Sequence, residues 1–117
     1  MSIESGEIME REFNKLVRDN IPDIIKSNGE ESITRVLEKD EYRTELYKKL
    51  LEEANEVISS KTSEETIEEL ADVLEILRAI AELNGKKLDN VVEVAEQKRL
   101  KRGGFEKRIF LEKTYKK

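Results

Sequence analysis

Two pairs of acidic residues in the middle of the chain have the spacing of a carboxylate metal site. Glu53 and Glu56 lie three residues apart, and so do Glu69 and Asp72. Residues three apart on a helix share one face, with Cβ atoms about 5–6 Å apart. Each pair therefore presents two carboxylates to one side. Oxygen ligands of this kind suit Mg²⁺, with Mn²⁺ as the alternative.

The chain contains no histidine and no cysteine, which limits the chemistry open to it. Catalytic triads built on histidine, zinc sites with histidine ligands and thiolate metal sites are all excluded. Any catalysis must therefore use carboxylates, lysine, arginine, tyrosine or a hard metal ion.

Two long helices are expected to carry the acidic pairs. Apolar residues at helical spacing predict one helix over residues 40–59 and a second over residues 63–83. Thr62 and Glu65 form a capping-box pattern at the start of the second helix. The connection between the helices is short, which favours an antiparallel hairpin.

The register of such a hairpin places the two acidic pairs side by side. Residues at one level of a regular antiparallel hairpin have residue numbers with a constant sum. Glu53 with Asp72 and Glu56 with Glu69 share that sum. Clustered carboxylates repel one another unless a counter-charge is present. We therefore predict that all four hold a divalent cation, although either pair alone is more often a solvated helix face.

The fold is expected to be all-α, a bundle of about four helices with this hairpin at its centre. A short helix through Pro22 should end near Asn28, and a fourth helix is predicted over residues 88–101, stopped at Gly103.

Three further segments complete the predicted organisation. Residues 32–38 and 105–111 have short-strand character, so a small two-stranded β element made by both is an expected addition. Residues 1–10 are polar and without period, and we expect a flexible tail there. Residues 11–117 should form a single domain, since the chain has no repeat or linker and is long enough for one domain.

Composition and net charge limit the kinds of partner that the protein is expected to bind. The net charge of −5 argues against binding to a nucleic acid polymer. No apolar run reaches the roughly 20 residues that cross a bilayer, so no membrane partner is expected. The absence of cysteine fits a cytoplasmic location. The second long helix is apolar almost all round, which favours a place at the centre of a bundle or at a subunit interface.

A second set of candidate residues is basic and suited to a polyphosphate, because arginine matches phosphate geometry. The candidates for substrate binding are Lys15, Arg18, Lys98, Arg102 and Arg108. Two structural alternatives stay open. Basic residues 98–102 would also neutralise the carboxyl end of a helix, and Asp19 is an alternative ion-pair partner for Arg18 or Arg102.

Three blocks of the sequence resemble one enzyme superfamily. EEANEV at 52–57, followed by EELADVLEIL at 68–77, looks like the ExxE…ExxD signature of the all-α nucleoside triphosphate pyrophosphohydrolases. KLVRDNIPDII at 15–25 and KRLKRGGFEKRIFL at 98–111 are similar to blocks of a MazG-like, phosphoribosyl-ATP-pyrophosphohydrolase-like subgroup. The resemblance covers nearly the whole chain except the first dozen residues.

The resemblance implies a chemistry and a set of ligands. A metal-activated water would split a nucleoside triphosphate into monophosphate and pyrophosphate, in a dimer or tetramer of packed hairpins. The implied ligands of Mg²⁺ are Glu53, Glu56, Glu69 and Asp72. A carboxylate should accept the proton of the water, and the candidates are Glu53 and its neighbour Glu52.

The biological role has several candidates. House-cleaning of non-canonical nucleotides is favoured, because the block at 15–25 marks the MazG-like subgroup. The alternatives are a phosphoribosyl-ATP pyrophosphohydrolase of histidine synthesis and a non-catalytic helical module for oligomerisation or binding.

Overall fold

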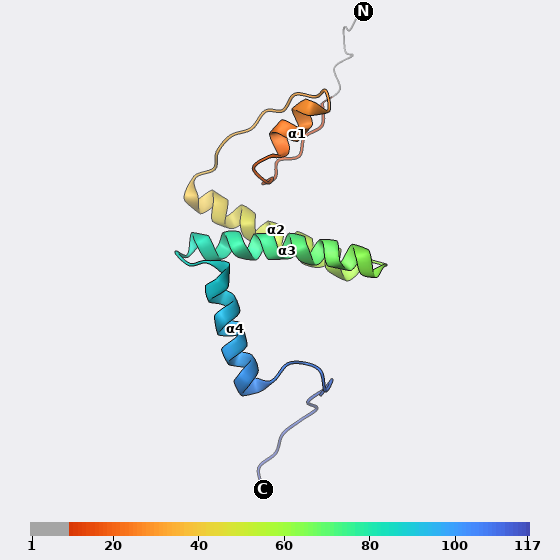
Figure 1. Ribbon diagram of the computed structural model, residues 1–117, viewed down its shortest axis with the longest axis vertical. Coiled ribbons are helices and arrows are strands. Elements are labelled where there is room, and N and C mark those ends of the chain that lie inside the picture. The colour runs from red at the N-terminus through yellow and green to blue at the C-terminus, as the bar shows by residue number, and fades with distance from the viewer. Residues whose placement is uncertain (1–9) are drawn as a thin grey trace, which may run out of the picture. The chain divides into compact units, whose positions relative to one another are not determined.

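The computed structural model describes residues 10–117, and this part of the chain consists of four α-helices joined by irregular segments (Figure 1). The helices are α1 (Ile21–Ser27), α2 (Lys39–Ser59), α3 (Ser63–Leu83) and α4 (Leu88–Arg102). The predicted all-α fold is confirmed, and each helix begins and ends within about a residue of the expected position. The tail predicted over residues 1–10 lies, except for its last residue, outside the described residues.

The expected β element is wrong, since the described residues contain no strand. Residues 32–38 are irregular, and the side chains of Ile33 and Val36 are 102% and 97% exposed. Residues 105–111 are likewise irregular, and Phe105 is 96% exposed. Apolar residues of strand character form a strand only where a partner takes up the backbone hydrogen bonds and a core covers one face. Both segments lack that pairing.

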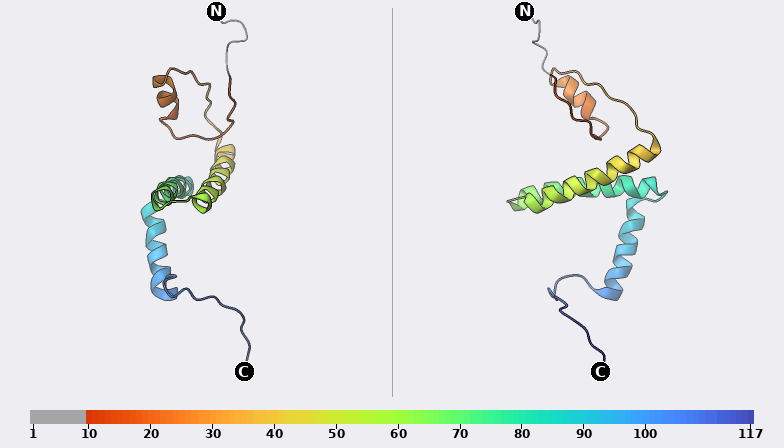
Figure 2. Two further views of the ribbon diagram at one scale, coloured as in Figure 1. Left: turned by 90° about the vertical axis from the view of Figure 1, so that its right-hand side faces the viewer. Right: turned by 180° about the vertical axis from the view of Figure 1, so that it is seen from behind.

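The chain divides into two compact units, Met1–Ile76 and Leu77–Lys117, which are described separately. The first unit contains α1, α2 and most of α3. In it, α2 and α3 run antiparallel side by side, as the views in Figures 1 and 2 agree in showing. The predicted central hairpin is therefore confirmed.

Side-chain hydrogen bonds hold the short turn between α2 and α3. Thr62 Oγ1 accepts a bond from the Glu65 N–H at 3.1 Å, which is one half of the predicted capping box. The Glu65 carboxylate accepts from the N–H of Lys61 at 2.9 Å, one residue earlier than a regular box requires. The hydroxyls of Ser60 and Thr66 are 2.7 Å apart and share a hydrogen bond. These bonds fix the turn and with it the register of the hairpin.

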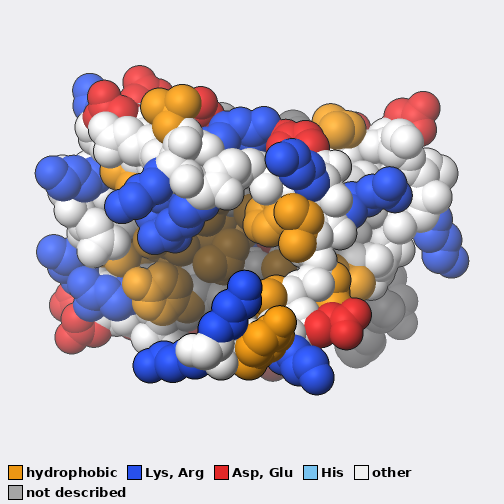
Figure 3. Space-filling view, turned by 90° about the horizontal axis from the view of Figure 1, so that it is seen from below, with side chains coloured by type: hydrophobic (Ala, Val, Ile, Leu, Met, Phe, Trp, Pro, Cys, Tyr) orange, Lys and Arg blue, Asp and Glu red, His pale blue; other side chains and the backbone are white. Residues whose placement is uncertain are grey.

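The buried core of the first unit is small. Among its described residues, Leu46 of α2 and Ile76 of α3 are the buried apolar side chains, 3% and 6% exposed. Large apolar side chains of the hairpin stay exposed: Leu51, Ile58, Ile67, Leu70 and Leu74. In a view of the whole molecule from below, hydrophobic side chains lie exposed among those of lysine and arginine (Figure 3). An apolar surface of this kind is typical of an interaction site.

The second unit contains the end of α3, α4 and the segment that follows it. The side chain of Asn90 stabilises the start of α4, because its Oδ1 accepts a hydrogen bond from the Lys87 N–H at 2.9 Å. The helix ends at Gly103, whose φ of 83° favours glycine. Ala81 and Leu88 are buried here. Within the described residues, every helix is too short or too polar to span a membrane.

Candidate metal centre

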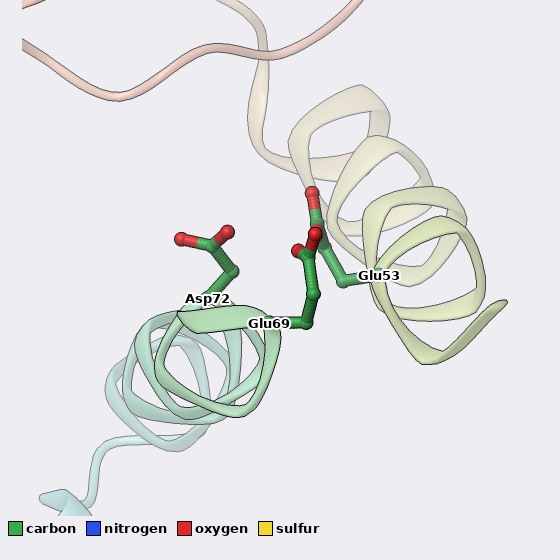
Figure 4. A group of neighbouring side chains, drawn as sticks. All are labelled: Glu53, Glu69 and Asp72. Atoms are coloured by element: carbon green, nitrogen blue, oxygen red, sulfur yellow. The ribbon is translucent and has the colours of Figure 1, made fainter. Parts of the chain in front are cut away.

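Three of the four predicted metal ligands converge between α2 and α3 (Figure 4). Glu53 of α2 and Glu69 and Asp72 of α3 each offer one carboxylate oxygen, and these oxygens lie within 4.8 Å of one another. Helical spacing puts Glu69 and Asp72 on one face of α3. The antiparallel register brings Glu53 to that face from α2. All three side chains are half-buried.

The fourth predicted ligand lies beside this trio. Glu56 is exposed and has no oxygen within the 4.8 Å group, yet it lines the same surface hollow. The hollow has a volume of about 220 Å³. Its lining residues are Lys15, Glu52, Glu53, Glu56, Glu69 and Asp72. Five carboxylates and a single lysine line the hollow, so negative charge dominates it.

Partial burial, together with the neighbouring carboxylates, raises the pKa of Glu69 above its ordinary value. Partial burial is the largest cause, because it disfavours the charged form. The negative charges of Glu53, Glu56 and Asp72 raise the pKa further, and so does a hydrogen bond with Asp72. Burial and the negative charge of the neighbouring acids therefore both disfavour the charged form of Glu69.

We predict that Glu69→Gln raises the melting temperature at neutral pH in chelator-containing buffer. The pKa of Glu69 is higher in the folded chain than in the unfolded chain, so the folded state binds the proton more readily. Stability from this group therefore falls as pH rises from about 4.5 through the raised pKa, and glutamine avoids that loss. Melts followed by circular dichroism from pH 3.5 to 8 should show the higher melting temperature of Glu69→Gln at neutral pH.

The gain should disappear below pH 4.5, the ordinary glutamate pKa, where both states hold the proton. Glu68→Gln is the matched control, since it removes a neighbouring exposed acid of α3 that does not line the hollow. A wild-type protein that melts at or above the temperature of Glu69→Gln at pH 7 would contradict the prediction.

Two of the predicted phosphate ligands lie at this centre. Lys15 lines the hollow. Arg18 Nη2 donates a hydrogen bond to Asp72 Oδ1 at 2.7 Å, with side chains 55% and 44% exposed. The alternative pairing of Arg18 with Asp19 is therefore not the one adopted. The contact joins residues 54 apart in the sequence, and nothing in residues 15–25 by themselves identified Asp72 as the partner.

The other three basic candidates belong to the second unit. Lys98 is an exposed residue of α4, and Arg102 is its last residue. Arg108 has a φ of 54° and donates its N–H to the Phe105 carbonyl at 3.0 Å. As phosphate ligands these residues stay predictions. Next to them, Arg99 and Glu106 form an ion pair at 2.5 Å, which brings the segment after Gly103 back to α4.

The donor set of the centre fits a hard divalent cation. It consists of carboxylate oxygens, and the chain has no histidine or cysteine to add nitrogen or sulfur. Mg²⁺ and Mn²⁺ prefer such ligands, whereas zinc sites usually include nitrogen or sulfur. Three acids from two helices, with a fourth at the rim, supply more than enough negative charge to neutralise a divalent ion.

Comparison with known proteins gave one family. The model of the phosphoribosyl-ATP pyrophosphohydrolase family matches residues 11–99, about three quarters of the chain. The match includes Lys15, Arg18 and all the acidic residues of the hollow, and it ends before Arg102 and Arg108. Neither a curated protein nor a solved structure matches the chain.

Proposed function

This chain belongs to the phosphoribosyl-ATP pyrophosphohydrolase family, and from that premise we propose that it hydrolyses a nucleoside triphosphate to the monophosphate and pyrophosphate. Membership makes it a pyrophosphohydrolase of the MazG-like superfamily, which typically depends on a divalent metal. The observation that carries the proposal is the convergence of Glu53, Glu69 and Asp72 between two helices. We propose Mg²⁺ as the cofactor, with Mn²⁺ as a substitute.

The acidic side chains would have different roles. Glu53, Glu69 and Asp72 would hold the cation, and Glu56 would assist from the rim of the hollow. When bound, the cation supplies Lewis acidity toward the phosphate oxygens and toward water. Glu52 is our candidate for the general base, because it lines the hollow but stands outside the trio. Its carboxylate is 3.5 Å from Lys49 Nζ.

The basic side chains would receive the polyphosphate. A triphosphate approaching five carboxylates needs positive charge beside the metal ion. Lys15 lines the hollow and Arg18 is bonded to Asp72, so both stand next to the acids. Lys98, Arg102 and Arg108 are proposed as further phosphate ligands from their sequence pattern.

There are two candidate classes of substrate, and the same bond would be cleaved in both. We favour house-cleaning of non-canonical nucleoside triphosphates, from the block at 15–25. Phosphoribosyl-ATP is the second candidate, because the matching family carries that name. Both substrates lose pyrophosphate when the bond between the α- and β-phosphates breaks, so the site chemistry proposed above serves either.

A panel of canonical and damaged nucleoside triphosphates with phosphoribosyl-ATP tests the proposal. We predict pyrophosphate and a monophosphate as products in Mg²⁺, and a loss of at least about 100-fold when a chelator removes the metal. Added Mg²⁺ should restore the rate. Release of orthophosphate, or a rate indifferent to the chelator, would contradict the proposal. No turnover together with a melting temperature indifferent to Mg²⁺ and nucleotide would favour the non-catalytic module.

We also propose that copies of this chain assemble through the exposed apolar face of the hairpin into a homodimer or homotetramer. Ile67, Leu70 and Leu74 recur on α3 at helical spacing and are 65%, 47% and 45% exposed. The small core of the first unit gives such an assembly a clear energetic reason. A cytoplasmic location, without a nucleic acid polymer or a membrane as partner, belongs to the same proposal.

A further inference from the structure

We propose that Arg18 and the metal ion compete for Asp72, so that the triphosphate and the metal ion strengthen each other's binding. The inference rests on the proposed function and adds the regulation of the same site. It concerns the order of events at the centre: the metal ion by itself binds weakly, and the triphosphate makes its binding tight by taking Arg18 away from Asp72.

The geometry of the first unit carries the competition. Arg18 Nη2 is 2.7 Å from Asp72 Oδ1, the distance of a charge-assisted hydrogen bond. Asp72 also offers an oxygen within 4.8 Å of those of Glu53 and Glu69. A cation held by these three acids would therefore share Asp72 with a guanidinium that is positively charged at every working pH.

The segment that carries Arg18 has a defined local backbone, and the Arg18 side chain has room to turn. Asn14, with a φ of 48°, adopts the left-handed backbone that asparagine tolerates better than most residues, and it precedes Lys15. The Arg18 carbonyl accepts the Ile21 N–H at 3.0 Å where α1 begins. The Arg18 side chain is 55% exposed. An exposed ion pair of this kind is weak and yields readily to a competitor.

The positive charge of Arg18 weakens the binding of the metal ion and strengthens the binding of the triphosphate. One positive charge about 5 Å from a divalent ion, at a solvated and salt-screened site, lowers affinity for that ion about fivefold. A triphosphate reverses the effect, because its oxygens offer the guanidinium two hydrogen bonds at once. Arg18 then adds to triphosphate affinity, and Asp72 is left to the metal ion. Since the coupling is reciprocal, each ligand raises the affinity of the other.

Arg18→Gln tests the inference with readouts that do not depend on turnover. The probes are Mn²⁺ alone, followed by electron paramagnetic resonance of the free ion, and inorganic triphosphate titrated calorimetrically in saturating Mn²⁺. We expect Arg18→Gln to bind Mn²⁺ alone about fivefold more tightly and triphosphate about tenfold more weakly. Arg18→Lys keeps the charge, so its affinity for Mn²⁺ alone should stay at the wild-type value.

Arg35→Gln is the matched control, because Arg35 is an exposed arginine paired with Glu41 of α2 at 2.7 Å and does not line the hollow. It should change neither affinity. Unchanged or weaker Mn²⁺ binding by Arg18→Gln would overturn the competition and leave Arg18 as a positioning residue. Asp72→Asn distinguishes a failure of the proposed function from a failure of this inference alone. If it binds Mn²⁺ as well as wild type does, the metal centre and the proposed function fail. If it loses Mn²⁺ while Arg18→Gln behaves as wild type, this inference alone fails.

Discussion

Replacing Asp72 by asparagine should abolish pyrophosphate release while the helical content of the protein stays unchanged. Asparagine keeps the size of the side chain and removes its charge. Asp72 contributes one of the three converging oxygens and accepts the hydrogen bond of Arg18, so the substitution weakens the metal centre and its counter-charge together. A metal ion contributes several kcal/mol to a phosphoryl transition state, which corresponds to a loss of at least about 1,000-fold.

The measurement is initial pyrophosphate release in saturating Mg²⁺, with far-ultraviolet circular dichroism on the same samples. Glu69→Gln should lose activity to a similar degree, and it leaves the partner of Arg18 in place. Glu68→Gln, an exposed acid of α3 that does not line the hollow, should keep the wild-type rate. Wild-type activity in Asp72→Asn would remove the assignment of the metal centre, whatever the behaviour of the other variants.

The double substitution Leu70→Glu and Leu74→Glu should reduce the proposed assembly to single chains. These residues lie one helical turn apart on α3 and are 47% and 45% exposed in the single chain. If a second copy covers them, each chain would bury two carboxylates without partners in the interface, and that burial is strongly unfavourable. The separated chain would depend on a small core around Leu46 and Ile76, so its melting temperature should fall as well.

Light scattering after size-exclusion chromatography measures the mass directly. Ile33→Glu provides the control, because Ile33 is 102% exposed in an irregular segment outside the helices. It should retain the mass of the wild-type assembly. An unchanged mass in the double variant would exclude this face as the interface between copies, and a wild-type protein that is already a single chain would remove the proposed assembly.

Local signals determined the secondary structure of this protein. Pro22, the Thr62–Glu65 pattern and the glycine at 103 each act within one turn of the backbone, and the helices begin and end where these residues predict. The strand prediction failed for the opposite reason. A strand needs a partner from elsewhere, and apolar residues of strand character at 32–38 say nothing about whether that partner exists.

The acidic centre could be predicted because helical spacing and hairpin register both follow directly from the positions of the residues in the sequence. They placed Glu53 level with Asp72 and put Glu69 on the same face, as the structure does. The structure alone separated Glu56 from the trio, because small rotations of a helix decide which of two neighbouring acids reaches the shared point.

The tertiary structure also decided where the basic residues before α1 lie. The sequence by itself specified residue types: acids for a hard cation, arginine and lysine for phosphate, and no imidazole or thiolate. Only the folded chain brought Arg18 across 54 residues to Asp72. The physical reason is that such a contact depends on the path of an irregular segment. No periodicity encodes that path, whereas the positions of acids along two regular helices follow from their spacing.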